Sequence, residues 1–381
     1  MPFGAALSQH PIPAEAAGEV LGEVLERVGP EPDLAVLFAT APLTGAMEDI
    51  AATVRSVLRP RSLLGSTAVS VLAGDREVEE ESALSLWAGT TGAVETVRLE
   101  TVPSAEGVVV RGLPEASAPH EVGSQILVLL ADPFTFAADR FLEQLAVDRP
   151  GLRVIGGLAS SARGPGGNRL VLDGDLHHDG AVGVLVDTDS VQALVSQGCR
   201  PIGDPMIVTR AERNVVYTLA GRPALDRLME LAETASSEDR ALMGRGLHLG
   251  VVVDETRLEF GRGDFLVRNV LGGDQAAGAI AVGDEVAVGT TVQFQVRDAD
   301  TADEDLRALL AGTGHADGAL VFTCNGRGTH LFGVPHHDAG LVAEATDRRC
   351  AGMFCAGEIG PIGPRSFLHG FTASIALFRD P

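Results

Sequence analysis

The stretch LVFTCNGRGTHLFG at residues 320–333 holds the residue types best suited to chemistry. A short apolar run ends in Cys324, and Arg327 follows with Gly326 and Gly328 on either side. Glycines let the backbone take positive φ and approach a ligand closely, and a guanidinium presents a planar fork to a carboxylate or phosphate. Two interpretations are open: a binding loop around Arg327, or a turn arginine paired with a nearby acid.

The thiol of Cys324 is also open to two interpretations. Side chains alternate along a strand, so Cys324 shares a face with Leu320 and Phe322. A cysteine in that place is either a buried core thiol, as cysteines without a disulfide commonly are, or a functional group at the end of the strand.

A second candidate is Glu358, in the segment CAGEIGPIGP at residues 355–364. It follows a predicted strand at 351–355, a place that exposes a carboxylate at the rim of a sheet, where sites in α/β proteins form. The alternative is a solvated turn glutamate. If strands 319–324 and 351–355 are parallel neighbours, Arg327 and Glu358 lie on one rim.

Two further polar groups lie in apolar surroundings. Arg268 and Asn269 interrupt an apolar strand, so they either face a cavity or find partners, such as a bridge from Arg268 to Asp298 or Asp274. Arg297 precedes a predicted helix whose start favours anions. We expect Asp298 to act there as a cap and a bridge.

The residue inventory excludes several chemistries. All 29 basic residues are arginine, so Schiff-base chemistry, pyridoxal-phosphate anchoring and lysine-based phosphate loops are impossible. The sequence has no G-x-G-x-x-G motif and no nucleophile elbow. The histidine pairs His177-His178 and His336-His337 are adjacent, which disfavours a simple chelate, and the four cysteines lack zinc-site spacing. We therefore predict no metal.

Composition narrows the partners and the location. The 381-residue chain carries a formal net charge of −23, which repels phosphate backbones and anionic lipid. No apolar run approaches the roughly 18 residues of a membrane span, and the N-terminus lacks the pattern of a secretory signal. We expect a cytoplasmic protein that binds neither nucleic acid nor membrane.

Hydrophobic periodicity predicts a mixed α/β (α+β) fold. Amphipathic spacing predicts helices, with a capping box at Thr301 and Glu304 opening one of them, and buried or alternating runs predict strands. Residues 103–123 are rich in Pro, Gly and Ser and are predicted to form a long loop. We divide the chain into three parts: an N-terminal helical segment 1–33 and two lobes, 34–218 and 219–381, each a mixed, largely antiparallel sheet flanked by helices.

Several of these segments together resemble the FIST domain. VIGGLASS, VSQGCRPIGDPMIVT and LAGRPALDRL resemble its N-terminal half; FLVRNVLGGD, VQFQVRDADTADEDL, FTCNGRGTHLFG and AGMFCAGEIGPIG resemble its C-terminal half. The resemblance runs in order from about residue 34 to residue 378, and it is loosest over 34–125.

The resemblance implies a sensory module that binds a small ligand, with amino acids proposed, in signal transduction. It implies a separate signalling partner, such as a histidine kinase, because this chain has no room for an output domain. It carries over no catalytic residue. The matching positions expected to line the ligand site are Arg268, Asn269, Arg297, Cys324, Arg327, Glu358 and His369.

Two alternatives stay open. Some family members look like haem-dependent nitric-oxide sensors that control a histidine kinase, although 4% aromatic residues is little for a haem pocket. The other alternative is a thiol-dependent enzyme that uses Cys324 as its nucleophile. The preferred hypothesis is that the protein binds an amino acid or a similar small anionic or zwitterionic ligand, without a cofactor.

Overall fold

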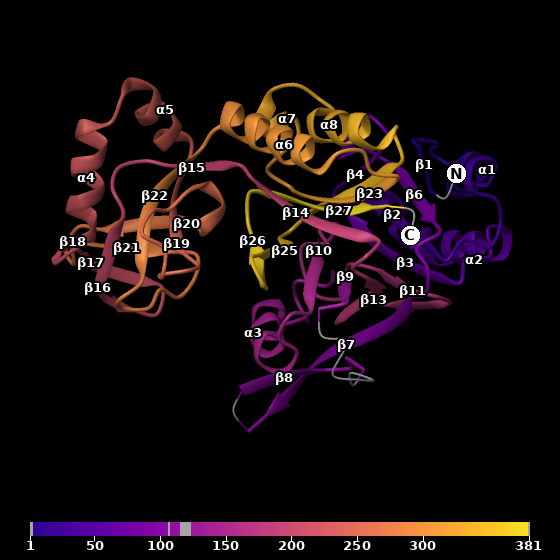
Figure 1. Cartoon of the computed structure of the whole chain (residues 1–381), viewed down its shortest axis with the longest axis horizontal. Coiled ribbons are helices and arrows are strands. Elements are labelled where there is room, and N and C mark those ends of the chain that lie inside the picture. The colour runs from indigo at the N-terminus through magenta and orange to yellow at the C-terminus, as the bar shows by residue number, and fades with distance from the viewer. Residues whose placement is uncertain (1–2, 106, 115–122, 380–381) are drawn as a thin grey trace. The chain divides into compact units, whose positions relative to one another are not determined.

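The computed structural model describes residues 3–105, 107–114 and 123–379 (Figure 1). These residues form two compact units, the first drawn from residues 1–195, 307–368 and 372–381 and the second from residues 196–306 and 369–371. The chain leaves the first unit after residue 195 and returns to it at residue 307. The boundaries of these units differ from those of the predicted lobes, 34–218 and 219–381. The two lobes stay a prediction.

The first unit contains three sheets. In spatial order, the strands of the first sheet are β1 (Phe3–Ser8), β6 (Leu84–Gly89), β2 (Leu34–Thr40), β3 (Ser62–Ala68), β11 (Leu170–Leu172) and β12 (Asp175–His177). Those of the second are β26 (Arg365–His369), β25 (Glu358–Ile362), β10 (Arg153–Leu158), β9 (Gln125–Ala131), β13 (Ala181–Asp187), β7 (Glu95–Ser104) and β8 (Gly107–Arg111). Those of the third are β14 (Val191–Gln197), β27 (Thr372–Phe378), β23 (Gly318–Cys324), β24 (Cys350–Cys355), β4 (Ser70–Ala73) and β5 (Arg76–Glu79).

One arrangement recurs in all three sheets. A parallel pair of strands, joined by a helical connection, has an antiparallel neighbour on each side. The parallel pairs are β2–β3, β9–β10 and β23–β24. Their connections are η1 (Ala41–Ala46) with α2 (Met47–Val57), then α3 (Ala138–Asp148), then α7 (Thr329–Phe332) with α8 (His337–Thr346). The first unit is therefore a threefold structural repeat, which the sequence does not reveal as repeated letters.

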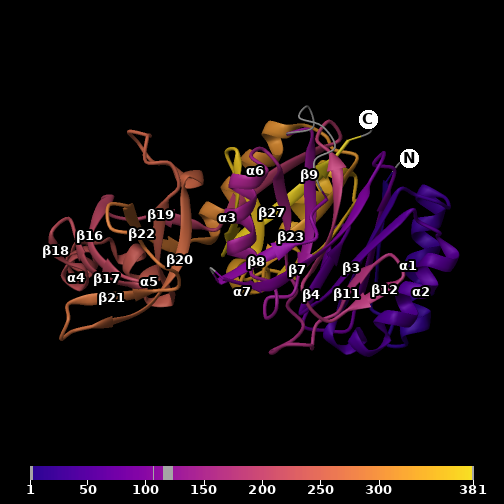
Figure 2. The same ribbon diagram turned by 90° about the horizontal axis from the view of Figure 1, so that it is seen from below.

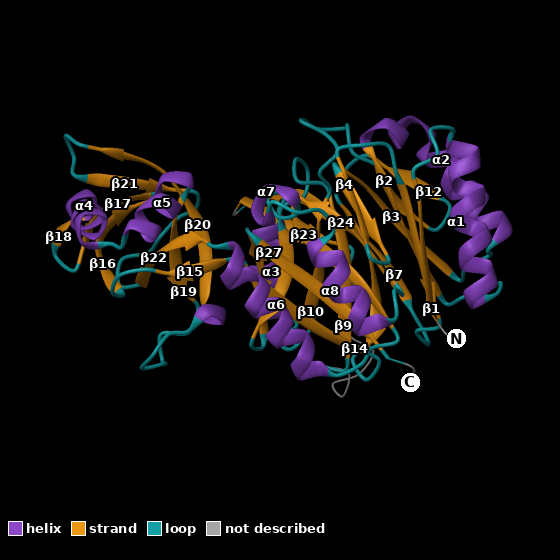
Figure 3. Ribbon diagram, turned by 90° about the horizontal axis from the view of Figure 1, so that it is seen from above, coloured by secondary structure: helices purple, strands orange, loops and turns teal. Residues whose placement is uncertain are grey.

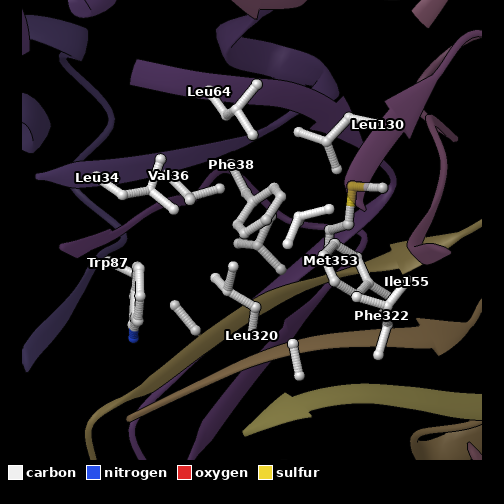
Figure 4. Close-up of a cluster of buried hydrophobic side chains, with 14 of the residues drawn as sticks. Leu34, Val36, Phe38, Leu64, Trp87, Leu130, Ile155, Leu320, Phe322 and Met353 are labelled. Atoms are coloured by element: carbon white, nitrogen blue, oxygen red, sulfur yellow. The ribbon is translucent and has the colours of Figure 1, made fainter. Parts of the chain in front are cut away.

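The three sheets share one apolar core. Side chains of the first sheet (Leu34, Val36, Phe38), the second (Leu130, Ile155) and the third (Leu320, Phe322, Met353) lie in one buried cluster (Figure 4). Phe38 and Phe322 meet edge to face with ring centroids 6.3 Å apart. This shared core holds the third sheet against the other two sheets. Strands β23 and β24 of the third sheet end at Cys324 and Cys355.

Helices cover the outer faces of the sheets. Helix α1 (Pro13–Val28) and α2 pack their apolar sides on the first sheet (Figure 2). Helix α3 packs on the second sheet, and α8 packs on the third sheet (Figure 3). Helix α6 (Ala299–Thr313) carries the chain from the second unit back to the first. Among the described residues no helix combines the length and the apolar character needed to cross a membrane.

The second unit is built around a closed antiparallel sheet. Strands β22 (Thr291–Arg297), β16 (Met206–Glu212), β17 (Val215–Leu219), β21 (Ala279–Val282), β20 (Phe265–Asp274) and β19 (Leu247–Val252) follow one another, and β19 pairs again with β22. Strands β15 (Cys199–Pro201) and β18 (Arg222–Pro223) add to its edges, and α4 (Ala224–Thr234), α5 (Ser237–Arg245) and η3 (Arg262–Asp264) complete the unit. Val292, Phe294 and Val296 enter its core, as their alternation predicts.

The mixed α/β class is confirmed, but some local predictions are wrong. The segment predicted as helical up to residue 33 also contains strand β1, whose apolar residues FGAALS pair with β6. Residues 107–111 form strand β8 within the predicted loop 103–123, because they complete a hairpin with β7; residues 106 and 115–122 lie outside the described residues. Helix α6 begins at Ala299, so the predicted cap Thr301 lies inside it, and Thr301 Oγ1 donates to Asp298 instead.

Candidate functional site

The candidate site begins where the parallel strands β23 and β24 end. Their register pairs Cys324 with Cys355, so these strands are parallel neighbours and the condition set for a shared rim is met. Residues paired in register on parallel strands project to the same face of the sheet, here the face that carries Leu320, Phe322 and Met353. Cys355 is fully buried, whereas Cys324, at the end of its strand, is partly exposed.

The turn after Cys324 is shaped by its glycines. The N–H of Arg327 donates to the carbonyl of Cys324 at 2.8 Å, and the N–H of Gly326 lies 3.5 Å from the Cys324 sulfur, which it approaches as a donor. Gly328 has φ of +60°, and a Cβ there would lie 2.9 Å from the carboxylate of Glu79. Only glycine meets both conditions, and the same carboxylate accepts from the N–H and the hydroxyl of Thr329.

Arg327 is fully buried rather than exposed in a turn. Its Nε and Nη2 donate to the two carboxylate oxygens of Asp338 at 2.7 and 2.8 Å, and Thr323 donates to the same carboxylate. Of the two interpretations, pairing with an acid is the one found, although the pair is buried and not exposed: Asp338, in the first turn of α8, accepts from two nitrogens of the guanidinium. Burial alone would raise the pKa of Asp338, but the charge and hydrogen bonds of Arg327 outweigh burial and hold that pKa well below its usual range.

Two atoms at this site lack the partners that buried polar atoms need. No described residue accepts a hydrogen bond from Nη1 of Arg327, and none donates in hydrogen-bonding geometry to Oε1 of Glu358. Both side chains are fully buried, and they interact electrostatically. A buried polar atom without a hydrogen-bond partner lowers the free energy of unfolding by about 1–3 kcal/mol. These two atoms therefore destabilise the folded protein.

Glu358 lies in strand β25 and is fully buried. The prediction of an exposed carboxylate after strand 351–355 is therefore wrong. Its Oε2 accepts from the N–H and the hydroxyl of Thr372 at 3.1 and 2.9 Å. Burial raises the pKa of Glu358 to about 8, although the hydrogen bonds from Thr372, the charge of Arg327 and the nearby Cys324 thiol all lower it. At neutral pH the carboxyl is mostly protonated and can exchange its proton with a ligand.

A third buried carboxyl borders the site. Oε1 of Glu77, in strand β5, accepts from the N–H of Ala339, and the N–H of Glu77 donates to His336 Nδ1. Burial and the charge of Asp338 raise the pKa of Glu77 to about 7. Sequence reasoning missed Glu77, Asp338 and Thr372. The one available signal was Asp338, an acid in the first turn of a helix whose other buried residues are mostly apolar.

The seven predicted ligand residues fall into two groups. Cys324, Arg327 and Glu358 belong to the first unit and are brought together there. Arg268, Asn269, Arg297 and His369 belong to the second unit.

In the second unit these residues have partners of their own. Arg268 forms its ion pair with Asp284 at 2.8 Å, not with Asp274 or Asp298. Asp298 bridges to Arg200 at 2.7 Å, which confirms its role in a bridge. Asn269 pairs in register with His248, and the Arg297 guanidinium lies 4.9 Å from the ring centroid of Phe371.

Within the described ranges, no three His, Cys, Asp or Glu side chains gather in a way that could hold a metal ion. The first-unit group offers the chemistry of several side chains. These are a guanidinium with one open nitrogen, a carboxyl that titrates near neutral pH, and two neighbouring thiols.

Comparison with known proteins places the whole chain in one family. The FIST N domain model matches residues 33–222, and the FIST C domain model matches residues 224–361. An uncharacterized protein of Mycobacterium tuberculosis is 41% identical over 387 residues, covering 100% of both chains. One of Mycobacterium bovis is 41% identical and covers 100% of this chain and 99% of its own. The chain belongs to the FIST family, whose domains are sensory domains related to signal transduction.

Proposed function

We propose that this protein is a cytoplasmic sensor that binds an amino acid or a similar small zwitterion at Arg327 and Glu358 and acts through a separate signalling partner, such as a histidine kinase. The observation that carries the proposal is the pair of buried, unpartnered atoms, Arg327 Nη1 and Glu358 Oε1. One is a donor on a cation and the other is an acceptor on a titrating acid.

A zwitterion supplies the complementary groups. Its carboxylate would accept from Nη1, and charge-assisted hydrogen bonds of this kind are the strong ones. Its ammonium would donate to Oε1 of Glu358. The Nε and Nη2 atoms of Arg327 donate to Asp338, so the direction of Nη1 is fixed before the ligand binds. This reduces the entropy cost of ordering the side chain on binding.

Proton release gives the proposal a distinctive signature. The pKa of Glu358 is about 8, so below that pH the carboxyl must lose its proton before it can pair with an ammonium. The affinity for a zwitterion should therefore rise with pH up to about 8, by at most about tenfold for each pH unit. A ligand without an ammonium should not show this rise.

The test uses the full chain and isothermal calorimetry with each standard L-amino acid alone. For any that binds, the matched N-acetyl derivative removes the ammonium and the matched methyl ester removes the carboxylate. Both derivatives should bind more weakly. Glu358→Gln should abolish the preference for the ammonium, while Glu344→Gln, the same change at an exposed glutamate of α8, should leave binding unchanged.

Two results would count against this function. One is the absence of binding by every standard amino acid. The other is equal affinity for an amino acid and its N-acetyl derivative. A Soret band that appears after reconstitution with haem would favour the haem-sensor alternative instead.

A further inference from the structure

We propose that Cys324 and Cys355 form a redox-reactive dithiol that a hydroperoxide closes into an intramolecular disulfide. The inference goes beyond ligand sensing, because the reaction needs only the two thiols, their surroundings and a peroxide.

The strand register places the two thiols within reach of each other. Cys324 and Cys355 are the final residues of β23 and β24 and are paired in register on one face. Neighbouring strands lie roughly 4.7–4.9 Å apart, and disulfides join Cα atoms about 4.4–6.8 Å apart. Past the two cysteines, the N–H of Asn325 still donates to the carbonyl of Cys355 at 3.0 Å, so the ends of the two strands stay side by side.

The surroundings give the two sulfurs different roles. Cys324 is partly exposed as a residue, and its sulfur is approached by the Gly326 N–H and interacts electrostatically with the Arg327 guanidinium. The partial exposure of Cys324 gives an oxidant access to this residue. Cys355 is fully buried, and burial raises the pKa of its thiol. Cys324 is therefore the thiol that reacts with the peroxide. Cys355 is the resolving thiol, which attacks the oxidised Cys324 to form the disulfide.

The chemistry balances with one peroxide. The Cys324 thiolate attacks one oxygen, the O–O bond breaks, and the other oxygen leaves as water, or as an alcohol from an alkyl hydroperoxide, giving a sulfenic acid. The Cys355 sulfur then attacks the Cys324 sulfur, the S–O bond breaks, and a second oxygen leaves as water. Two thiols are oxidised by two electrons and the peroxide is reduced by two. The Glu358 carboxyl interacts with both thiols and can give its proton to the leaving oxygen and regain one from Cys355.

The other two cysteines serve as internal controls. Cys350 begins β24, pairs in register with Ala319 and approaches the carbonyl of Gly74 with its sulfur. Cys350 and Cys355 lie five residue steps apart along the strand, which is about 16 Å. Burial raises the pKa of Cys350 to about 12. Cys199 is buried in the second unit.

The experiment maps oxidation in the folded full chain. The protein is treated with hydrogen peroxide, remaining thiols are alkylated after denaturation, and trypsin cuts after arginine. Cys324 falls in peptide 308–327, and Cys355 falls in peptide 350–365 together with Cys350. We expect these two peptides to be linked, with the loss of two hydrogens, and to separate after treatment with dithiothreitol. The link should persist in Cys350→Ala.

Single variants test the order of events. In Cys355→Ala, dimedone should label Cys324, because its sulfenic acid has no resolving thiol. In Cys324→Ala, dimedone should not label Cys355. Circular dichroism of each variant confirms that it is folded. Two outcomes would overturn the proposal: peptides that stay unlinked while Cys324 remains a thiol, or dimedone labelling of Cys324 in Cys355→Ala that does not exceed labelling of Cys199.

Discussion

The first unit contains two buried polar clusters that differ in one respect. Around Asp132 and Asn168, every polar side-chain atom has a partner. Asn168 donates to Asp132 at 2.8 Å, the other oxygen of Asp132 accepts from Thr135 and the N–H of Phe134, and Ser161 links Asn168 to Thr67. We call these residues the satisfied network. Around Arg327 and Glu358, by contrast, one guanidinium nitrogen and one carboxyl oxygen lack partners among the described residues.

The comparison separates structure from function. Both clusters lie where strands of the repeated arrangement end, so burial alone does not mark a site. A satisfied network holds loops in place and gains stability from each hydrogen bond. A cluster that leaves charged atoms unpartnered loses stability, and such a loss is expected where a ligand completes the set. The predictions that follow alter one cluster or the other, from the largest effect to the smallest.

The largest effect is expected from Asp338→Ala. The substitution leaves the Arg327 guanidinium buried without its partner, and breaking a buried pair in this way costs about 3–5 kcal/mol of unfolding free energy. Urea unfolding measures the loss. The double variant Arg327→Met with Asp338→Leu removes both charges and should recover most of it. If the single and double variants are equally unstable, packing rather than charge explains the loss.

The next effect depends on pH. The folded pKa of Glu358, about 8, is higher than the pKa of 4.5 taken for an unperturbed carboxyl. The folded protein therefore holds an extra proton between these values, and this carboxyl lowers stability progressively as pH rises through them, by at most about 1.4 kcal/mol per pH unit. Glu358→Gln removes this pH dependence. In urea unfolding, the free energy of unfolding of the variant should therefore rise relative to that of wild type as the pH increases toward 8. Parallel pH profiles would mean that Glu358 is ionised in the folded protein.

A smaller effect is expected in the satisfied network. Asp132→Ala leaves donors of Asn168, Thr135 and Phe134 without an acceptor, which costs about 1–3 kcal/mol. Thermal unfolding in the presence and absence of a bound amino acid separates stability from binding. Tm should fall, but the shift that the ligand causes should stay the same. Loss of the ligand-induced shift would show that the satisfied network belongs to the site.

The smallest effect is expected at the turn. Gly328→Ala forces a Cβ into positive φ and against the Glu79 carboxylate, which should cost about 1–2 kcal/mol. At Gly326, outside the positive-φ glycines, the same substitution should cost less. Chemical denaturation of the two variants checks the order, and equal losses would remove the special role of Gly328.

The sequence predicted the candidate site only in part. Two apolar strands that end in Cys324 and Cys355 suggested that Arg327 and Glu358 would lie near each other if the strands were parallel neighbours, and the register shows that they are. Their burial was not predictable, because glycine-rich segments after strands are typical of exposed turns. Asp338 and Thr372 lie 11 and 14 residues from their partners Arg327 and Glu358, in a helix and in a different strand. No periodicity connects them to these partners.

The fold shows the same limit. Hydrophobic periodicity predicted the mixed α/β class, because helices such as α1 and α2 each bury a regular apolar face. It could not predict that residues 307–368 return to the unit begun by residues 1–195. That return depends on core contacts such as Phe38 with Phe322, which pair residues far apart in the chain. The three sheets repeat in topology without repeating in sequence, since many apolar side chains can fill equivalent positions.

The most direct test of the central claim is calorimetric binding of one amino acid to wild type and to Glu358→Gln across pH. The account predicts that wild-type affinity rises with pH up to about 8, the pKa of Glu358, and that protons are released on binding. Affinity in Glu358→Gln should be weak and independent of pH. A wild-type affinity that does not change with pH, or a variant that binds as well as wild type, would contradict it.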